Sequence, residues 1–116
     1  MSEKLLEKRV SAYIQSSPIR TTPNVKGDIW ATWPMSKLVM YQDGLCLEIL
    51  FAGKFEFPYK NIIKFKKILL GFQIEHNIQG IKPYVFIGGM GNGGILIKKV
   101  KEVISNNNLG IEFDDK

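Results

Sequence analysis

The most constraining feature of the sequence is a long stretch of short apolar runs separated by turn signals. It extends from Gly27 to Ile87, and within many of the runs apolar side chains recur at every second position. Alternation with period 2 is typical of strands that bury one face and expose the other. The pattern predicts seven strands, over residues 27–33, 36–42, 45–51, 54–57, 62–68, 71–77 and 83–87.

The boundaries between these runs carry residues that favour tight turns. Asp43-Gly44 and Ala52-Gly53 supply the positive φ that short hairpins need. Pro34 lacks a backbone N–H, so a strand ends there or lies at a sheet edge. Such closely spaced turns predict an antiparallel sheet that folds over into a barrel or two-sheet roll.

A short amphipathic helix is predicted before the strands, over residues 3–15. Its apolar residues follow the spacing i, i+4, i+7 and i+8, which places side chains on one face of a helix. A polar connector with two prolines follows at 16–26. We expect the apolar face to pack against the barrel or a neighbouring copy. The candidate partner surface on this helix is Leu6, Val10, Tyr13 and Ile14.

A second amphipathic helix is predicted over residues 93–106. Leu96, Ile97 and Val100 lie on its apolar face, with lysines opposite. In the tail, residues 109–113 either add a short strand or fray. The predicted organisation is an N-terminal helix and linker (1–26), a β-barrel domain with its C-terminal helix (27–106) and a tail (107–116).

Four segments in this order carry a family resemblance: KLVMYQDGL (37–45), FPYKNI (57–62), FQIEH (72–76) and PYVFI (83–87). Together with seven strands followed by one helix, they resemble the pleckstrin-homology (PH) superfold, in particular the small bacterial PH-like domains. The resemblance implies a mainly β, seven-stranded antiparallel barrel or roll closed by the C-terminal helix. For eukaryotic members it also implies phosphoinositide binding at the turn after the first strand, where Lys37 is the basic residue here.

The composition limits the chain to one domain without covalent cross-links. Its 116 residues suffice for one core. The single cysteine excludes an intramolecular disulfide framework and an all-cysteine zinc site. No segment approaches the roughly 20 apolar residues of a membrane-spanning helix. We therefore expect a cytoplasmic protein, with no cofactor and no metal.

The net charge of +5 is concentrated in one stretch. Residues 54–67 carry five lysines and one glutamate, a net charge of +4. This stretch is either a solvated sheet face or an anion-binding stripe for phosphorylated headgroups, an acidic membrane or an acidic protein. The candidate anion or lipid contacts are Lys37, Lys54, Lys64, Lys66 and Lys67.

Aromatic residues give a further indication about partners. Phe55, Phe57 and Phe65 interleave with these lysines, but alternation puts the rings on the opposite face. A single-strand binder needs both on one platform, so nucleic acid is not expected as a partner. Trp30 and Trp33 are expected on one strand face, either in the core, which we favour, or as an exposed aromatic patch for a partner.

Three features could indicate an enzyme. The glycine-rich loop 88–94 contains a G-x-G-x-x-G pattern, but six tight turns precede it where a dinucleotide fold needs parallel strands with crossover helices. His76 is the single histidine, on the predicted buried face, and Cys46 lies mid-strand. These patterns indicate packing and a flexible crossover, and they predict no catalytic residue.

The sequence thus favours a non-enzymatic binding or scaffold domain that contacts a protein partner or a second copy. The alternative is a peripheral module that binds acidic membranes or phospholipid headgroups through residues 54–67. A small nucleotide-binding or hydrolytic enzyme is the third hypothesis.

Overall fold

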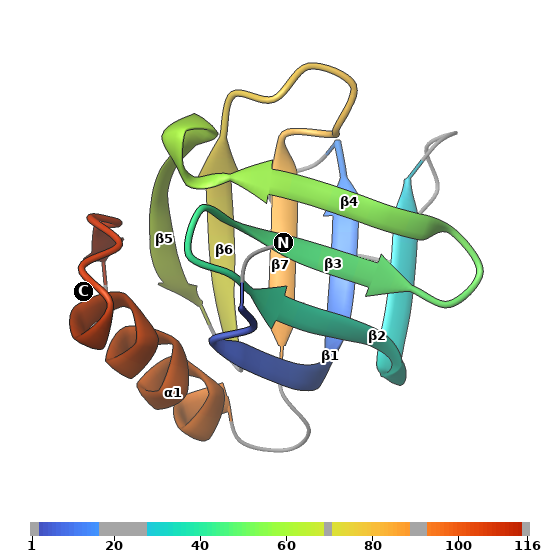
Figure 1. Ribbon diagram of the computed structural model, residues 1–116. Coiled ribbons are helices and arrows are strands. Elements are labelled where there is room, and N and C mark those ends of the chain that lie inside the picture. Colours follow the sequence, from blue (N-terminus) through green and yellow to red (C-terminus); the bar gives the residue numbers. More distant parts are fainter. Residues whose placement is uncertain (1–2, 17–27, 69–70, 89–92, 115–116) are drawn as a thin grey trace.

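A single curled sheet of eight strands and one α-helix make up the parts of the chain that the structure describes. The structure is a computed structural model, and it describes residues 3–16, 28–68, 71–88 and 93–114. The strand order is β4-β3-β2-β1-β7-β6-β5-β8, bent into a half-barrel (Figure 1). The elements are β1 (Leu6–Gln15), β2 (Ile29–Met40), β3 (Gly44–Ile49), β4 (Gly53–Pro58), the 3-10 turn η1 (Tyr59–Asn61), β5 (Ile62–Ile68), β6 (Gly71–His76), β7 (Tyr84–Gly88), α1 (Gly93–Asn106) and β8 (Phe113–Asp114).

The predicted N-terminal helix is wrong, because residues 6–15 form strand β1. This strand lies at the centre of the sheet and pairs antiparallel with β2 on one side and β7 on the other. Val10, Ala12 and Ile14 are buried at alternate positions. Residues four positions apart share a face in a helix and also in a strand, so the spacing of Leu6, Val10 and Ile14 fits both. Ala12, which helical spacing leaves out, shows that the period is 2.

The two strands predicted over 27–33 and 36–42 are one long strand, β2. Pro34 lies within it and does not end it, because this part of β2 bulges away from the ladder. The later predictions agree closely with the structure: β5 and α1 have the predicted bounds, and β3, β4, β6 and β7 differ by one or two residues at their ends. The mainly β class is confirmed, whereas seven strands and an N-terminal helix are not.

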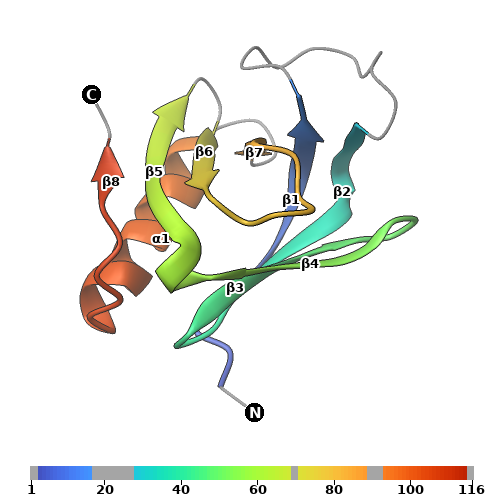
Figure 2. The same cartoon turned by 90° about the horizontal axis from the view of Figure 1, so that it is seen from above.

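The core fills the inside of the curled sheet and continues under α1. Phe57, Phe65 and Phe72 are the largest side chains that are fully buried there. Leu96, Ile97 and Val100 bury the inner face of α1, which packs against β6 and β1 (Figure 2). Burial of these apolar side chains supplies the main driving force for the curl.

Strand β5 contains a bulge that changes which of its side chains face the core. The register with β6 shifts between Ile62 and Lys64, so Ile62 and Phe65 are buried and Ile63 is 60% exposed. Simple alternation through this strand predicts that Ile63 is buried together with Phe65, and the bulge makes that prediction wrong. The tail adds a two-residue strand, β8 (Phe113–Asp114), which pairs parallel with β5. It is shorter than the strand predicted over 109–113 and overlaps only the last residue of that range.

Gly71 gives a test of the pairing between β6 and β7. A Cβ at this position would lie 1.9 Å from the carbonyl oxygen of Ile87. We therefore expect Gly71→Ala to lower the free energy of unfolding by about 3 kcal/mol, measured by urea denaturation. The control Gln73→Ala, on a half-buried position of the same strand, should cost about 1 kcal/mol or less. Equal midpoints for the two variants would contradict this close pairing.

Candidate functional site

A large bulge in β2 defines the candidate site. Val10 pairs with Ser36 and Ala12 pairs with Ala31, so the four residues of β2 from Thr32 to Met35 lie opposite Ser11 of β1. Three extra residues cannot be accommodated in a regular ladder, so the chain must leave the plane of the sheet. The peptide bond between Trp33 and Pro34 within the bulge is cis.

Side chains of β1 and β2 replace the missing ladder bonds. The hydroxyl of Ser36, which is buried, donates to the carbonyl oxygen of Val10 at 2.6 Å. The backbone N–H of Trp33 donates to the hydroxyl of Ser11 at 2.8 Å, and the Arg9 guanidinium donates to the Pro34 carbonyl at 3.2 Å. The bulge is thus held in one conformation by polar contacts along its base.

The turn between β3 and β4 lies beside the bulge. The backbone N–H of Leu50 donates to the carbonyl of Met35 at 3.0 Å, which ties the two segments together. The N–H of Ala52 donates to the carbonyl of Ile49, and Gly53 adopts a φ of +97°, a region that favours glycine. The turn therefore projects Leu50 and Phe51 into solvent, where they are 76% and 65% exposed.

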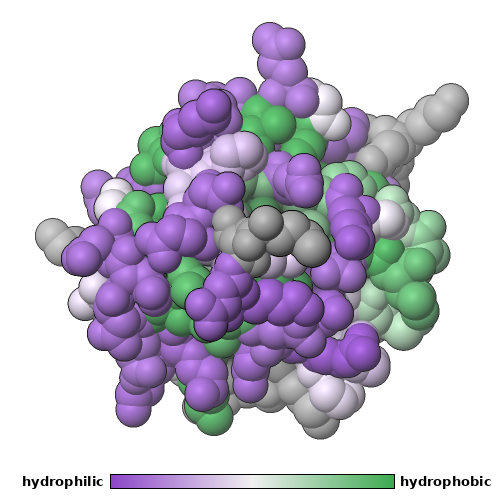
Figure 3. Space-filling model, viewed as in Figure 1, coloured by the Kyte–Doolittle hydropathy of each residue, from purple (hydrophilic) through white to green (hydrophobic). Residues whose placement is uncertain are grey.

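Together the bulge and the turn form an exposed apolar surface, which we call the hydrophobic patch. Its residues are Trp30, Met35, Leu50 and Phe51, and Trp33 is exposed in the same bulge; these are five of the seven large apolar residues that are exposed in the described chain. Apolar atoms gather on this side of the molecule, where β2 and the β3–β4 turn lie (Figure 3, right). Isolated exposed apolar residues are ordinary, whereas a cluster of this kind is a candidate contact surface.

Two shallow hollows give the patch its shape, and Met35 lines both of them. One has a volume of about 470 Å³, and Trp30, Met35 and Phe51 are the large exposed apolar residues among those that line it. The other, of about 280 Å³, lies between Met35, Leu50 and the charged side chains described next. The favoured expectation that Trp30 and Trp33 are core residues is wrong. Both are about 40% exposed, as the alternative of an exposed aromatic patch requires.

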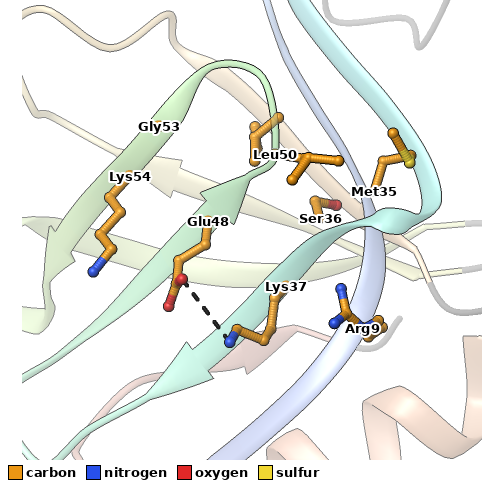
Figure 4. Close-up of a pocket in the computed structure, with 9 residues that line it drawn as sticks. Arg9, Met35, Ser36, Lys37, Glu48, Leu50, Gly53 and Lys54 are labelled. Atoms are coloured by element: carbon orange, nitrogen blue, oxygen red, sulfur yellow. Dashed lines mark ion pairs between the residues drawn. The ribbon is translucent and has the colours of Figure 1, made fainter.

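Three cations border the smaller hollow. Arg9, Lys37 and Lys54 come from β1, β2 and β4, with the carboxylate of Glu48 among them (Figure 4). The Lys37 ammonium lies 3.9 Å from Glu48 and 3.8 Å from Glu7, so its charge is partly balanced. The rim of the hydrophobic patch is therefore mixed in sign, with an excess of positive charge.

The predicted lysine stripe does not exist as one surface. Lys37 and Lys54 border the patch, whereas Lys64, Lys66 and Lys67 lie on β5, at the opposite side of the sheet (Figures 1 and 2). The Asp114 carboxylate lies 3.4 Å from the Lys64 ammonium and, through this hydrogen bond first and its charge second, raises the pKa of Lys64. Asp114 thus balances part of the positive charge of the β5 lysines.

The predicted N-terminal partner surface is also wrong. Val10 and Ile14 have exposed fractions of 0% and 1% and belong to the core of the sheet. Leu6 and Tyr13 are half-buried on the same strand. Because β1 is paired on both sides, these side chains cannot form a free helical face.

His76 and Cys46 occupy structural positions. Nδ1 of His76 accepts a hydrogen bond from the N–H of Ile78 at 3.0 Å, and Nε2 lies 3.0 Å from the carbonyl of Lys82. Both ring nitrogens are thus engaged by the backbone, and the ring stacks edge-on against Phe57. Burial, and after it the nearby Glu48 and Glu56 carboxylates, raises the pKa of the Cys46 thiol, the opposite of what a nucleophile needs.

Two further sequence features complete the comparison with the prediction. The centre of the glycine-rich loop, residues 89–92, lies outside the described residues. Among the residues that the structure describes, no group of three His, Cys, Asp or Glu side chains could hold a metal ion. No helix within the described ranges has the length and apolar character needed to cross a membrane.

Comparison with known proteins supplies no identity. No protein-family model matches the chain, and no curated protein matches it significantly.

Sequence reasoning missed Arg9, Met35, Leu50 and Phe51. A signal for the last two was present, because Ile49, Leu50 and Phe51 are three consecutive apolar residues before a turn, and alternation cannot turn all three inward. No local signal identified Arg9 and Met35, since they reach the site through the pairing of β1 with the bulged part of β2.

The hydroxyl of Ser36 tests how the bulge is held. We expect Ser36→Ala to lower the free energy of unfolding by about 1–2 kcal/mol, because the buried carbonyl of Val10 loses its hydrogen bond. Thr32→Ala, at an exposed position of the same bulge, should change it by about 0.5 kcal/mol or less. Thermal unfolding of the two variants checks this, and equal melting temperatures would contradict it.

Proposed function

We propose that this chain is a non-enzymatic binding domain of the PH-like type, which docks a protein partner through the hydrophobic patch. The order of strands β1 to β7 followed by α1 supports the PH-like assignment. The observation that carries the binding function is the exposure of Leu50 and Phe51 at a turn that hydrogen bonds hold in place.

The energetics of the patch favour a contact function. Side chains held in place before binding lose less conformational entropy when a partner covers them. Trp30 and Trp33 are of the residue type most enriched among residues that dominate binding energy. The charged rim of Arg9, Lys37 and Lys54 matches the usual arrangement of an apolar centre within a polar border.

The non-enzymatic part of the proposal rests on the two side chains best suited to catalysis. The ring nitrogens of His76 are held by backbone groups, and the raised pKa of the Cys46 thiol keeps it protonated near neutral pH. Neither is poised as a general base or a nucleophile.

A comparison of two double variants tests the patch. Leu50→Ser with Phe51→Ser removes the turn's apolar side chains, whereas Ile63→Ser with Ile95→Ser makes the same chemical change at two positions that are each 60% exposed elsewhere. We expect proteins captured from a cell extract by the immobilised wild-type chain to be lost with the first variant and kept with the control, as quantified by mass spectrometry. Equal retention on both variants would refute a role for the patch.

A second candidate function is docking on acidic membranes. The observation that favours it is the position of Arg9, Lys37 and Lys54 beside an apolar turn, since exposed apolar residues next to cations bind anionic bilayers. In this hypothesis the membrane contacts the patch and not the lysines of β5.

Vesicle sedimentation distinguishes the two candidates. If the membrane hypothesis holds, binding to phosphatidylcholine vesicles should appear when phosphatidylserine is added, fall at high salt, and weaken severalfold in Lys54→Glu. Lys66→Glu, the same charge change on an exposed position of β5, should have little effect. Equal binding to acidic and neutral vesicles, or none to either, would exclude this candidate and leave the protein partner.

A further inference from the structure

Strand β4 ends one side of the sheet, and in the part of the chain that the structure describes it pairs with β3 and with no other strand. Figure 2 looks down onto this edge from above. Its central residues are Lys54, Phe55 and Glu56, of which the two charged side chains are exposed and Phe55 is half-buried. A free edge presents backbone donors and acceptors in a row and accepts another strand unless something blocks it.

The hydrogen-bond pattern of the β3–β4 hairpin identifies which backbone groups point outward. The N–H of Tyr59 donates to the carbonyl of Asp43, so Tyr59 and Asp43 form a hydrogen-bonded pair. Phe55 lies opposite Leu47 in the same register, four residues earlier in the chain. In an antiparallel pair, hydrogen-bonded positions alternate with non-bonded ones. Phe55 therefore directs its N–H and C=O toward β3, and Lys54 and Glu56 direct theirs toward the open edge.

These outward groups define how an antiparallel copy of β4 could add across a two-fold axis. Only registers that pair outward-facing residues with one another form ladder bonds. Placing Lys54 opposite itself, or Glu56 opposite itself, brings like charges together, which destabilises a cross-strand pair. Centring the axis on Phe55 places Lys54 opposite Glu56 of the second copy, and Glu56 opposite its Lys54. The ladder then has four N–H to C=O bonds and two ion pairs.

A row of charges across the sheet points to the same partner. Lys37 on β2 pairs with Glu48 on β3, and Glu48 pairs with Lys54 on β4, so the sign alternates across these three strands. On β1 the residue opposite Lys37 is Arg9, and Glu7 lies diagonally, 3.8 Å from the Lys37 ammonium. Figure 4 shows Lys37, Glu48 and Lys54 on one side of the sheet. The row ends on a cation at the free edge, so the next strand should supply an anion there. Glu56 of a second copy does so.

We propose that this chain forms a two-fold homodimer in which two β4 strands pair antiparallel, centred on Phe55. The two sheets then join into one continuous sheet. A lysine on an edge strand by itself discourages strand addition. Here the two-fold rotation places Glu56 of the second copy opposite Lys54 of the first, which removes that obstacle. This interface goes beyond the proposed function and uses the edge of the hairpin, which shares Lys54 with the rim of the patch but none of its apolar residues.

Sedimentation equilibrium of the full chain tests this interface. The wild-type chain should sediment as a monomer–dimer equilibrium. Glu56→Lys and Lys54→Glu should each raise the dissociation constant about tenfold or more, because both ion pairs become like-charge contacts. An equimolar mixture of the two variants should form a heterodimer with near wild-type affinity, since both lysines of one chain then face glutamates of the other. Glu102→Lys, at an exposed position of α1, is the matched charge control and should not change dimerisation.

Several results would overturn the proposal. The first is a wild-type chain that stays monomeric up to millimolar concentration. The second is that Glu56→Lys and Lys54→Glu dimerise as tightly as the wild-type chain. The third is that the mixture of the two variants does not regain the wild-type affinity. Loss of the dimer in Leu50→Ser with Phe51→Ser, but not in Glu56→Lys, would assign self-association to the hydrophobic patch instead. Circular dichroism of each variant verifies that the sheet is intact, so a failure to fold is not counted as a loss of dimer.

Discussion

The unequal length of β1 and β2 is the constraint on which the candidate site depends. Four residues of β2 lie opposite one residue of β1, while the pairs on both sides keep a regular ladder. The extra backbone has to leave the sheet, and Ser11, Arg9 and Ser36 satisfy its polar groups at the base. The apolar side chains of the bulge then have no remaining core to enter. Their exposure follows from the pairing of β1 with β2.

One hairpin, β3–β4, presents two surfaces of different chemistry. Its turn carries the apolar side chains of Leu50 and Phe51, and its outer edge carries the backbone groups and charges of Lys54 and Glu56. In the proposed dimer, Phe51 of one copy lies eight residues along the ladder from Phe51 of the other, about 27 Å at 3.4 Å per residue. The two turns then project at opposite ends of the joined sheet. Two such tips on one assembly would bind a multivalent partner or a surface more tightly than one.

Local sequence patterns predicted the bounds of those strands and of the helix whose ends are marked by turn residues or whose apolar spacing fits one structure only. The predicted bounds of β5, β6, β7 and α1 lie within one or two residues of the structure, because turn residues mark the ends of these strands and helical spacing marks α1. The pattern of residues 6–15 fits a helix and a strand equally, because apolar residues four positions apart share a face in both. The segment is a strand, and it pairs with β2 on one side and β7 on the other. Ile63 departs from simple alternation because a bulge in β5 shifts the register.

The candidate site was harder to predict because it depends on long-range pairing. Lys54 belongs with Arg9 and Lys37, from two other strands, and not with the lysines that follow it in the sequence. Trp30 and Trp33 were favoured as core residues because large aromatic residues usually bury most of their surface. Trp30 points outward because its ladder neighbour Ala31 points inward, and Trp33 is exposed because it lies in the bulge, which depends on the register of β1 against β2.

The central claim is that the bulge in β2 displays apolar side chains to solvent, and the intrinsic fluorescence of the protein tests it most directly. The chain has two tryptophans, Trp30 beside the bulge and Trp33 within it, and both are about 40% exposed. The structure predicts emission shifted to the red relative to buried indole and efficient quenching by acrylamide in the folded protein. Emission typical of buried indole, with weak quenching that rises only when the protein is unfolded in urea, would contradict it.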